Sequence, residues 1–140
     1  MLHNLKVEGK IEIFEEGKLV LEKKNLVVNN GLSWICDRMK DDTVTYLDYI
    51  AVGTDATVVA ASDTALITEL ERKQSTNKTA GVGSFIIDAL FSGSEAQGIW
   101  KEAGIFTAAS SGTMFDRVNI DFTKTNKNVT VRFTITFTNS

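Results

Sequence analysis

Few residues of this 140-residue chain could do acid–base or nucleophilic chemistry. His3 is the only histidine and Cys36 the only cysteine, and no catalytic motif flanks either one. His3 falls near the amino terminus, where chains are seldom tied down. A Ser-His triad or a histidine-rich metal site is therefore poorly supported. Cys36 stands in S-W-I-C-D-R-M, a pattern typical of a buried helix, so we expect an unreactive, packed thiol.

Carboxylates are the next candidates, because pairs of them hydrolyse glycosides and larger sets bind calcium. Three sets come into question: Asp41, Asp42 and Asp48; Glu69 and Glu71; and Glu95 and Glu102. The first two sets lack the spacing of a calcium loop, and nothing places the third pair together. We therefore expect no catalytic residue, no metal ligand, no cofactor-binding residue and no cofactor, and we interpret the chain as a protein that is not an enzyme.

Phosphate and nucleic acid are also unsupported as ligands. The glycines of G-V-G-S at 81–84 lack the Lys-Ser/Thr pair and the following helix of a phosphate-binding loop. A net charge of −3 argues against a broad nucleic-acid surface. Basic residues near the expected turns are interleaved with glutamates, which favours ordinary solubility; they are Lys18, Lys23, Lys24, Lys124 and Lys127.

Aromatic residues leave one binding alternative open. Trp34, Trp100 and Phe106 could line a platform on which sugars stack, although packing in the core is the more common place for such side chains. Trp34 and Trp100 are the residues we assign to glycan stacking in this alternative, a carbohydrate-binding module for host-surface glycans.

The composition is that of one globular domain spanning residues 1–140, with 43% hydrophobic and 24% charged residues. No apolar run approaches the 18 or so residues of a membrane span, and the first ten residues lack the apolar stretch of a signal peptide. These features suit a protein made in the cytoplasm.

Strict alternation over residues 129–137 predicts the clearest strand. Val129, Val131, Phe133 and Ile135 would face one way and the intervening polar residues the other. So long an apolar face needs a second layer to cover it. Further strand patterns cover residues 6–14, 19–22, 26–28, 46–52, 84–91, 98–106 and 113–122. In the last of these, Arg117 is expected on the polar face.

Strands spaced about ten residues apart predict an antiparallel β-sandwich, jelly-roll-like in form. Residues 1–24 would form an opening hairpin. The polar stretch 71–79 is an edge strand or a loop. One short helix is predicted near residues 31–41, with Leu32, Ile35, Cys36 and Met39 as its apolar stripe.

Four segments occur in an order that resembles a known group of proteins. They are K-N-L-V-V-N-N-G-L (24–32), Y-I-A-V-G-T-D (49–55), A-S-D-T-A-L-I-T-E-L-E-R (61–72) and E-A-G-I-F-T-A-A-S-S-G-T-M-F-D-R (102–117). The chain from about residue 25 onward is similar to small structural proteins of tailed bacteriophages, which are tail-fibre-like or decorate the particle. The proline usual in the loop after Y-I-A-V-G-T is absent here, and Val58 and Val59 stand in its place.

The resemblance implies a non-enzymatic virion component, made in the host cytoplasm and assembled with other virion proteins. It further implies a homo-oligomer, for which we favour a trimer, with the 1–24 hairpin as an attachment arm. Small side chains allow close approach, so the loops 54–64 and 107–112 are the expected sites of subunit contact. The candidate contact residues are Thr54, Asp55, Val58, Val59, Ser110 and Ser111.

Overall fold

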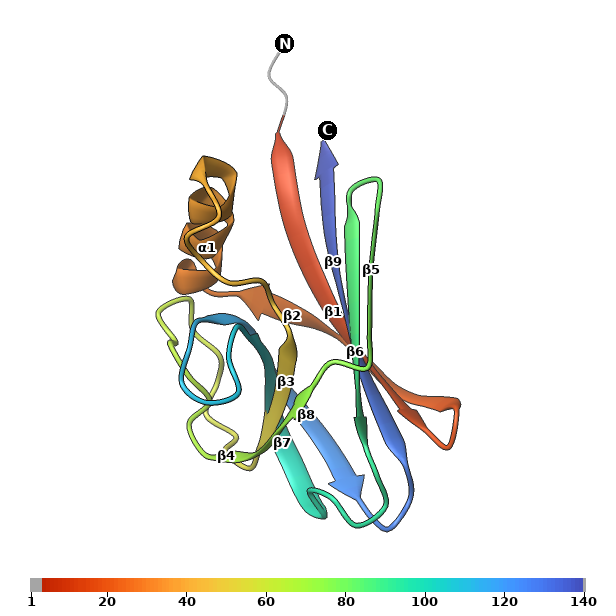
Figure 1. Cartoon of the computed structure of the whole chain (residues 1–140). Helices are drawn as coiled ribbons and strands as arrows, with labels where there is room; N and C mark the ends of the chain where they lie inside the picture. Colours follow the sequence, from red (N-terminus) through yellow and green to blue (C-terminus); the bar gives the residue numbers. More distant parts are fainter. Residues whose placement is uncertain (1–3, 140) are drawn as a thin grey trace.

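A computed structural model describes residues 4–139 of the chain. In this part, nine strands form one antiparallel sheet that curls on itself, accompanied by a single helix (Figure 1). The elements are β1 (Leu5–Glu15), β2 (Lys18–Val27), α1 (Asn29–Lys40), β3 (Tyr49–Gly53), β4 (Glu69–Gln74), β5 (Asn77–Gly81), β6 (Ser84–Phe91), β7 (Gly98–Phe106), β8 (Met114–Lys124) and β9 (Val129–Asn139). The prediction of a mainly β, antiparallel fold with one helix is confirmed.

The alternation that predicted the closing strand is confirmed in β9. Val129, Val131, Phe133 and Ile135 are buried, whereas the threonines between them are only partly covered. The neighbours of β9 in the sheet are β1 and β6, which add further apolar side chains to the same core, Ile11 among them. The predicted opening hairpin is also present, since β1 and β2 pair from Glu15 and Lys18 outward.

The layer that covers this face is the other half of the same sheet. Trp100, Ile105 and Val118 on β7 and β8 belong to the same core cluster as the residues of β9. The two halves are continuous through β2, which pairs with β1 over most of its length and with β8 through Leu26 and Val27. The two separate sheets of a jelly-roll-like sandwich are therefore not confirmed, because a single long strand turns the corner between the layers.

The polar stretch 71–79 supplies both edges of the sheet. The edge strands β4 and β5 follow one another in sequence, and only Ser75 and Thr76 separate them. The main-chain N–H of Ser75 donates to the carbonyl of Asp48, and that of Thr76 donates to the carbonyl of Asp88. The two ends of the curled sheet thus meet at this link.

Asp48 fixes the link with its side chain as well. Its carboxylate accepts hydrogen bonds from Gln74 (2.8 Å) and Ser75 (2.6 Å) and pairs with Lys78 (2.8 Å). Burial acts to raise the pKa of Asp48, but the bonds from Lys78, Ser75 and Gln74 outweigh it and leave the pKa lowered. Asp48 was considered above as a cation ligand; here its oxygens are taken up by the protein.

Helix α1 exists where it was predicted, but the predicted buried stripe is wrong. Leu32, Cys36 and Met39 are exposed, and the side chains that pack toward the core are Trp34 and Ile35. The packed, buried thiol is therefore corrected to an exposed one. Within residues 4–139, no helix has the length and apolar run needed to cross a membrane.

Gly31 explains which face of the helix turns inward. A methyl group built on it would overlap the main-chain carbonyl oxygen of Phe115 on β8, so only glycine lets the helix and the strand approach this closely. This contact sets the rotation of α1 about its axis. It was not visible in the spacing of apolar residues, because glycine does not register as an apolar position.

Gly31→Ala should lower the free energy of unfolding by about 1–2 kcal/mol. Helix propensity alone favours alanine by about 1 kcal/mol, but forcing a methyl group against backbone costs about 1–3 kcal/mol. Urea unfolding followed by circular dichroism measures the difference. Ser33→Ala, at an exposed position of the same helix, is the control and should be neutral or slightly stabilising. A stabilised Gly31→Ala variant would contradict the close contact.

Candidate functional site

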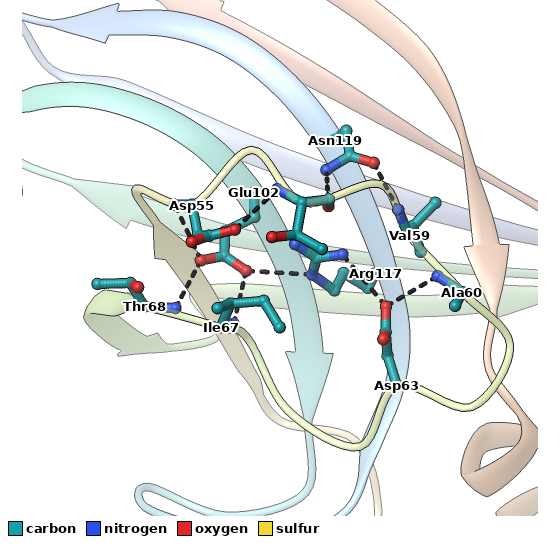
Figure 2. Close-up of polar contacts among 10 residues, drawn as sticks. Asp55, Val59, Ala60, Asp63, Ile67, Thr68, Glu102, Arg117 and Asn119 are labelled. Atoms are coloured by element: carbon teal, nitrogen blue, oxygen red, sulfur yellow. Dashed lines mark hydrogen bonds and ion pairs between the residues drawn. The ribbon is translucent and has the colours of Figure 1, made fainter.

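A buried ionic cluster lies on β7 and β8, on the face turned away from the main core. Glu102 and Arg117 are both fully buried, and Asp63 joins them from the long connection that precedes β4. The prediction of a solvent-facing Arg117 is therefore wrong. Residues 54–68 run across this face of the sheet and cover it; we call them the covering loop (Figure 2).

Glu102 holds both ends of the covering loop. One carboxylate oxygen, Oε2, accepts from the main-chain N–H groups of Asp55 (3.2 Å) and Thr68 (2.8 Å). The other, Oε1, accepts from the N–H of Ile67 (2.8 Å) and from Nε of Arg117 (3.1 Å). A single buried side chain thus replaces the backbone partners that a loop without secondary structure would otherwise lack.

The middle of the covering loop is held by two further side chains. Arg117 Nη1 lies 3.1 Å from Oδ2 of Asp63, and that oxygen also accepts from the N–H of Ala60 (2.9 Å). Asn119 donates to the carbonyl of Thr57 and accepts from the N–H of Val59, each at 2.8 Å. Figure 2 shows these contacts following one another along the loop. The loop is therefore tied down at both ends and in the middle.

Arg72 organises the second predicted contact loop, residues 107–112, in a similar way. Its Nη1 donates to the carbonyls of Ala108 (2.8 Å) and Ser111 (2.9 Å), and its guanidinium lies 3.7 Å from the centre of the Phe106 ring. Glu69 completes the arrangement with an ion pair of 2.6 Å. Since Arg72 belongs to β4, it joins this loop to the strand that directly follows the covering loop.

The six residues predicted as subunit contacts all keep some exposed surface. Thr54, Val58, Ser110 and Ser111 are exposed, with Val58 at 79%, while Asp55 and Val59 are half-buried because their backbone or side chain serves the loop itself. The structure brings them onto two immobilised loops at one end of the sheet. Whether they contact another subunit stays a prediction.

No protein-family model matches this chain, and no curated protein or solved structure matches it. The residues themselves therefore have to carry any functional argument.

The carboxylates considered for chemistry are engaged separately. Glu102 pairs with Arg117, whereas Glu95 pairs with Lys73 on another part of the molecule. The hydrogen bonds from Lys73 and from Ser92 lower the pKa of Glu95 to about 2. Within residues 4–139, no group of three or more metal-ligating side chains comes together. His3 lies outside the described residues.

The two tryptophans of the glycan alternative have different surroundings. Trp100 is fully buried between Phe91 and Phe122, with ring centroids 5.1 and 5.2 Å away, so its ring offers no face to a sugar. Trp34 is half-buried on α1, stands edge-on to Phe115 and lines a cavity. Of the two, only Trp34 is accessible to a ligand.

One further buried carboxyl belongs to the same pair of strands. Asp116 is fully buried; its Oδ1 accepts from the N–H of Ile105 (3.0 Å), and its Oδ2 accepts from the side chain of Asn25. Burial raises the pKa of Asp116 well above its usual range, although both hydrogen bonds act against it. Asn25 Oδ1 is buried without a partner among the described residues.

What this ionic arrangement can do is mechanical. None of the three main cavities in residues 4–139 is lined by Glu102 or Arg117. Their charges are directed at each other, at Asp63 and at main-chain groups of the covering loop, and so hold a surface in place. The sequence offered one signal for this role: a glutamate within the otherwise apolar end of the 98–106 pattern, which a buried strand tolerates only when it is paired.

Proposed function

We propose that this chain is a structural component of a tailed-bacteriophage virion, in the tail fibre, the baseplate or the capsid decoration, and that it works through contacts between subunits without catalysis. The observation that carries the proposal is the buried cluster of Glu102, Arg117 and Asp63, which holds a long connection immobile. The resemblance in sequence order supports the virion context.

The surface of the covering loop suits a protein partner. Val58 is 79% and Ile67 51% exposed, and Leu70 follows on the neighbouring edge strand with 42% exposed. A loop that is ordered before binding loses little conformational entropy when it docks, so its apolar side chains add to affinity more fully. We propose that identical subunits or sister virion proteins cover these side chains, in a homotrimer in the first case.

Sedimentation equilibrium of the purified protein tests the homo-oligomer. The expected mass at high protein concentration is three times the 15.4 kDa of the chain. The double variant Val58→Asp/Ile67→Asp should sediment as a monomer, because two carboxylates would then have to be buried at the interface. Both positions are exposed, so the variant should keep the unfolding curve of the parent protein.

Val82→Asp is the matched control, since Val82 is fully exposed at the turn between β5 and β6, away from the covering loop. This variant should assemble like the parent. A parent protein that stays monomeric at every concentration, or a double variant that assembles normally, would count against the proposed interface. Cryo-electron microscopy of a particle that incorporates the chain would separate a tail position from a capsid position.

A further inference from the structure

A cavity of about 360 Å³ opens between α1 and the strands β5, β6 and β9. Trp34 and Ile35 line it from the helix, and Phe85, Ile135 and Phe137 line it from the sheet. Figure 1 shows α1 standing beside this upper part of the sheet. The volume falls within the range of about 300–1,000 Å³ that is typical of small-molecule sites, and the lining is mostly apolar, as in such sites.

The helix is fixed at a distance from the sheet, so the cavity does not close by collapse. At one end of α1, Gly31 is in contact with Phe115. Farther along, Trp34 Nε1 donates to the carbonyl of Thr45 (2.7 Å), and Arg38 Nη1 donates to the carbonyl of Val44 (3.0 Å). These contacts tie the helix to the segment that follows it, and they leave apolar side chains of the sheet partly uncovered.

Charge at the cavity is of one sign. Arg38 and Lys78 line it, and none of its lining residues is acidic. Lys78 is already paired with Asp48 and lies 4.2 Å from the centre of the Tyr46 ring. Arg38 forms no ion pair with a carboxylate among residues 4–139, and Val44 takes only one of its five N–H groups.

We propose that this cavity binds a small amphipathic anion, with an acyl or aromatic body between α1 and the sheet and a single carboxylate at the guanidinium of Arg38. The apolar body would cover Phe85, Ile135 and Phe137, which the fold leaves partly open. A guanidinium is well matched to a carboxylate, because its planar donors can meet both oxygens at once. The inference is independent of the proposed virion role.

Dodecanoate is a suitable probe, compared with dodecyltrimethylammonium, which has an equal chain and the opposite charge. Both are titrated below their micelle concentrations while tryptophan fluorescence is recorded. Trp34 lines the cavity and Trp100 is buried elsewhere, so a saturable change reports binding at this site. We expect one dodecanoate per chain, bound at least about tenfold more tightly than the cation.

Ala80→Phe places a ring into the cavity from the exposed edge strand β5 and should weaken dodecanoate binding by about tenfold or more. Asn77→Phe adds the same ring on the same strand, at a position that does not line the cavity, and should bind like the parent protein. Arg38→Gln should reduce the preference for the anion while leaving the unfolding curve unchanged, because Arg38 is exposed.

Three results would overturn the proposal: no saturable signal, equal affinity for the two amphiphiles, or dodecanoate binding unaffected by both Ala80→Phe and Arg38→Gln. Circular dichroism shows whether Ala80→Phe has folded. If it has not, Arg38→Gln decides alone, since it changes charge at the mouth of the cavity and removes no core contact.

Discussion

Glu102→Ala should lower the free energy of unfolding by about 3–5 kcal/mol, the usual cost of breaking a buried ion pair from one side. The change leaves the guanidinium of Arg117 buried with one carboxylate partner, Asp63, in place of two. It also removes the acceptor of three main-chain N–H groups, those of Asp55, Ile67 and Thr68. Urea unfolding followed by tryptophan fluorescence measures the loss.

Two further variants separate the ion pair from the simple loss of side-chain volume. Glu102→Ala combined with Arg117→Met removes both charges, so part of the lost stability should return, because the uncompensated buried charge is gone. Asp121→Ala breaks the exposed pair of Lys101 and Asp121 on the same two strands and should cost no more than about 1 kcal/mol. A Glu102→Ala variant no less stable than Asp121→Ala would contradict the structural role given to Glu102.

The same variant links the fold to the proposed function. Without Glu102 the amides of Ile67 and Thr68 lose their acceptor, so their hydrogen exchange should become faster than that of amides in the core of the sheet. A loop that has become mobile must be ordered again when a subunit docks, and affinity falls accordingly. Exposed apolar residues such as Val58 would keep their chemistry but lose their fixed position.

The strands were predictable from the sequence because a half-buried strand writes a period of two into it. The predicted boundaries of β6 and β7 coincide with the observed ones, and β9 shows the expected alternation of buried and partly covered residues. What period cannot give is the partner of each strand. That β2 continues from one half of the sheet into the other depends on pairings with β1 and β8 that are distant in sequence.

The buried cluster was missed for a related reason. Arg117 alternates with apolar neighbours on β8, as a solvent-facing residue would, and only the covering loop turns its side of the strand into an interior. The face of α1 was missed because Gly31 decides it through a close approach to Phe115. In both cases a contact between segments far apart in the chain overrides the local pattern.

Asp116→Asn should stabilise the protein at neutral and alkaline pH, against the usual direction for a substitution in the core. Burial raises the pKa of Asp116 well above the unfolded value of 3.8. As pH rises above 3.8, the unfolded chain releases a proton that the folded protein still holds. Stability then falls by about 1.4 kcal/mol for each pH unit until the folded pKa is reached.

The asparagine variant keeps the shape of Asp116 and has nothing to ionise, so this loss should disappear. Its amide oxygen can accept from the N–H of Ile105, and its amide nitrogen can donate to Asn25 once the Asn25 amide turns over. The advantage over the parent protein should be smallest near pH 4 and grow with pH. Urea unfolding at a series of pH values from 5 to 9 measures it.

Asp121→Asn is the control for charge alone, because it removes one carboxylate from an exposed position of the same strand. Its unfolding free energy should follow the pH dependence of the parent protein. If Asp116→Asn shows that same dependence, or is less stable than the parent at pH 8, then Asp116 is ionised in the folded state. The buried hydrogen bonds from Ile105 and Asn25 would in that case outweigh the cost of burial, and the carboxylate would stabilise the junction between β2, β7 and β8 as a charge.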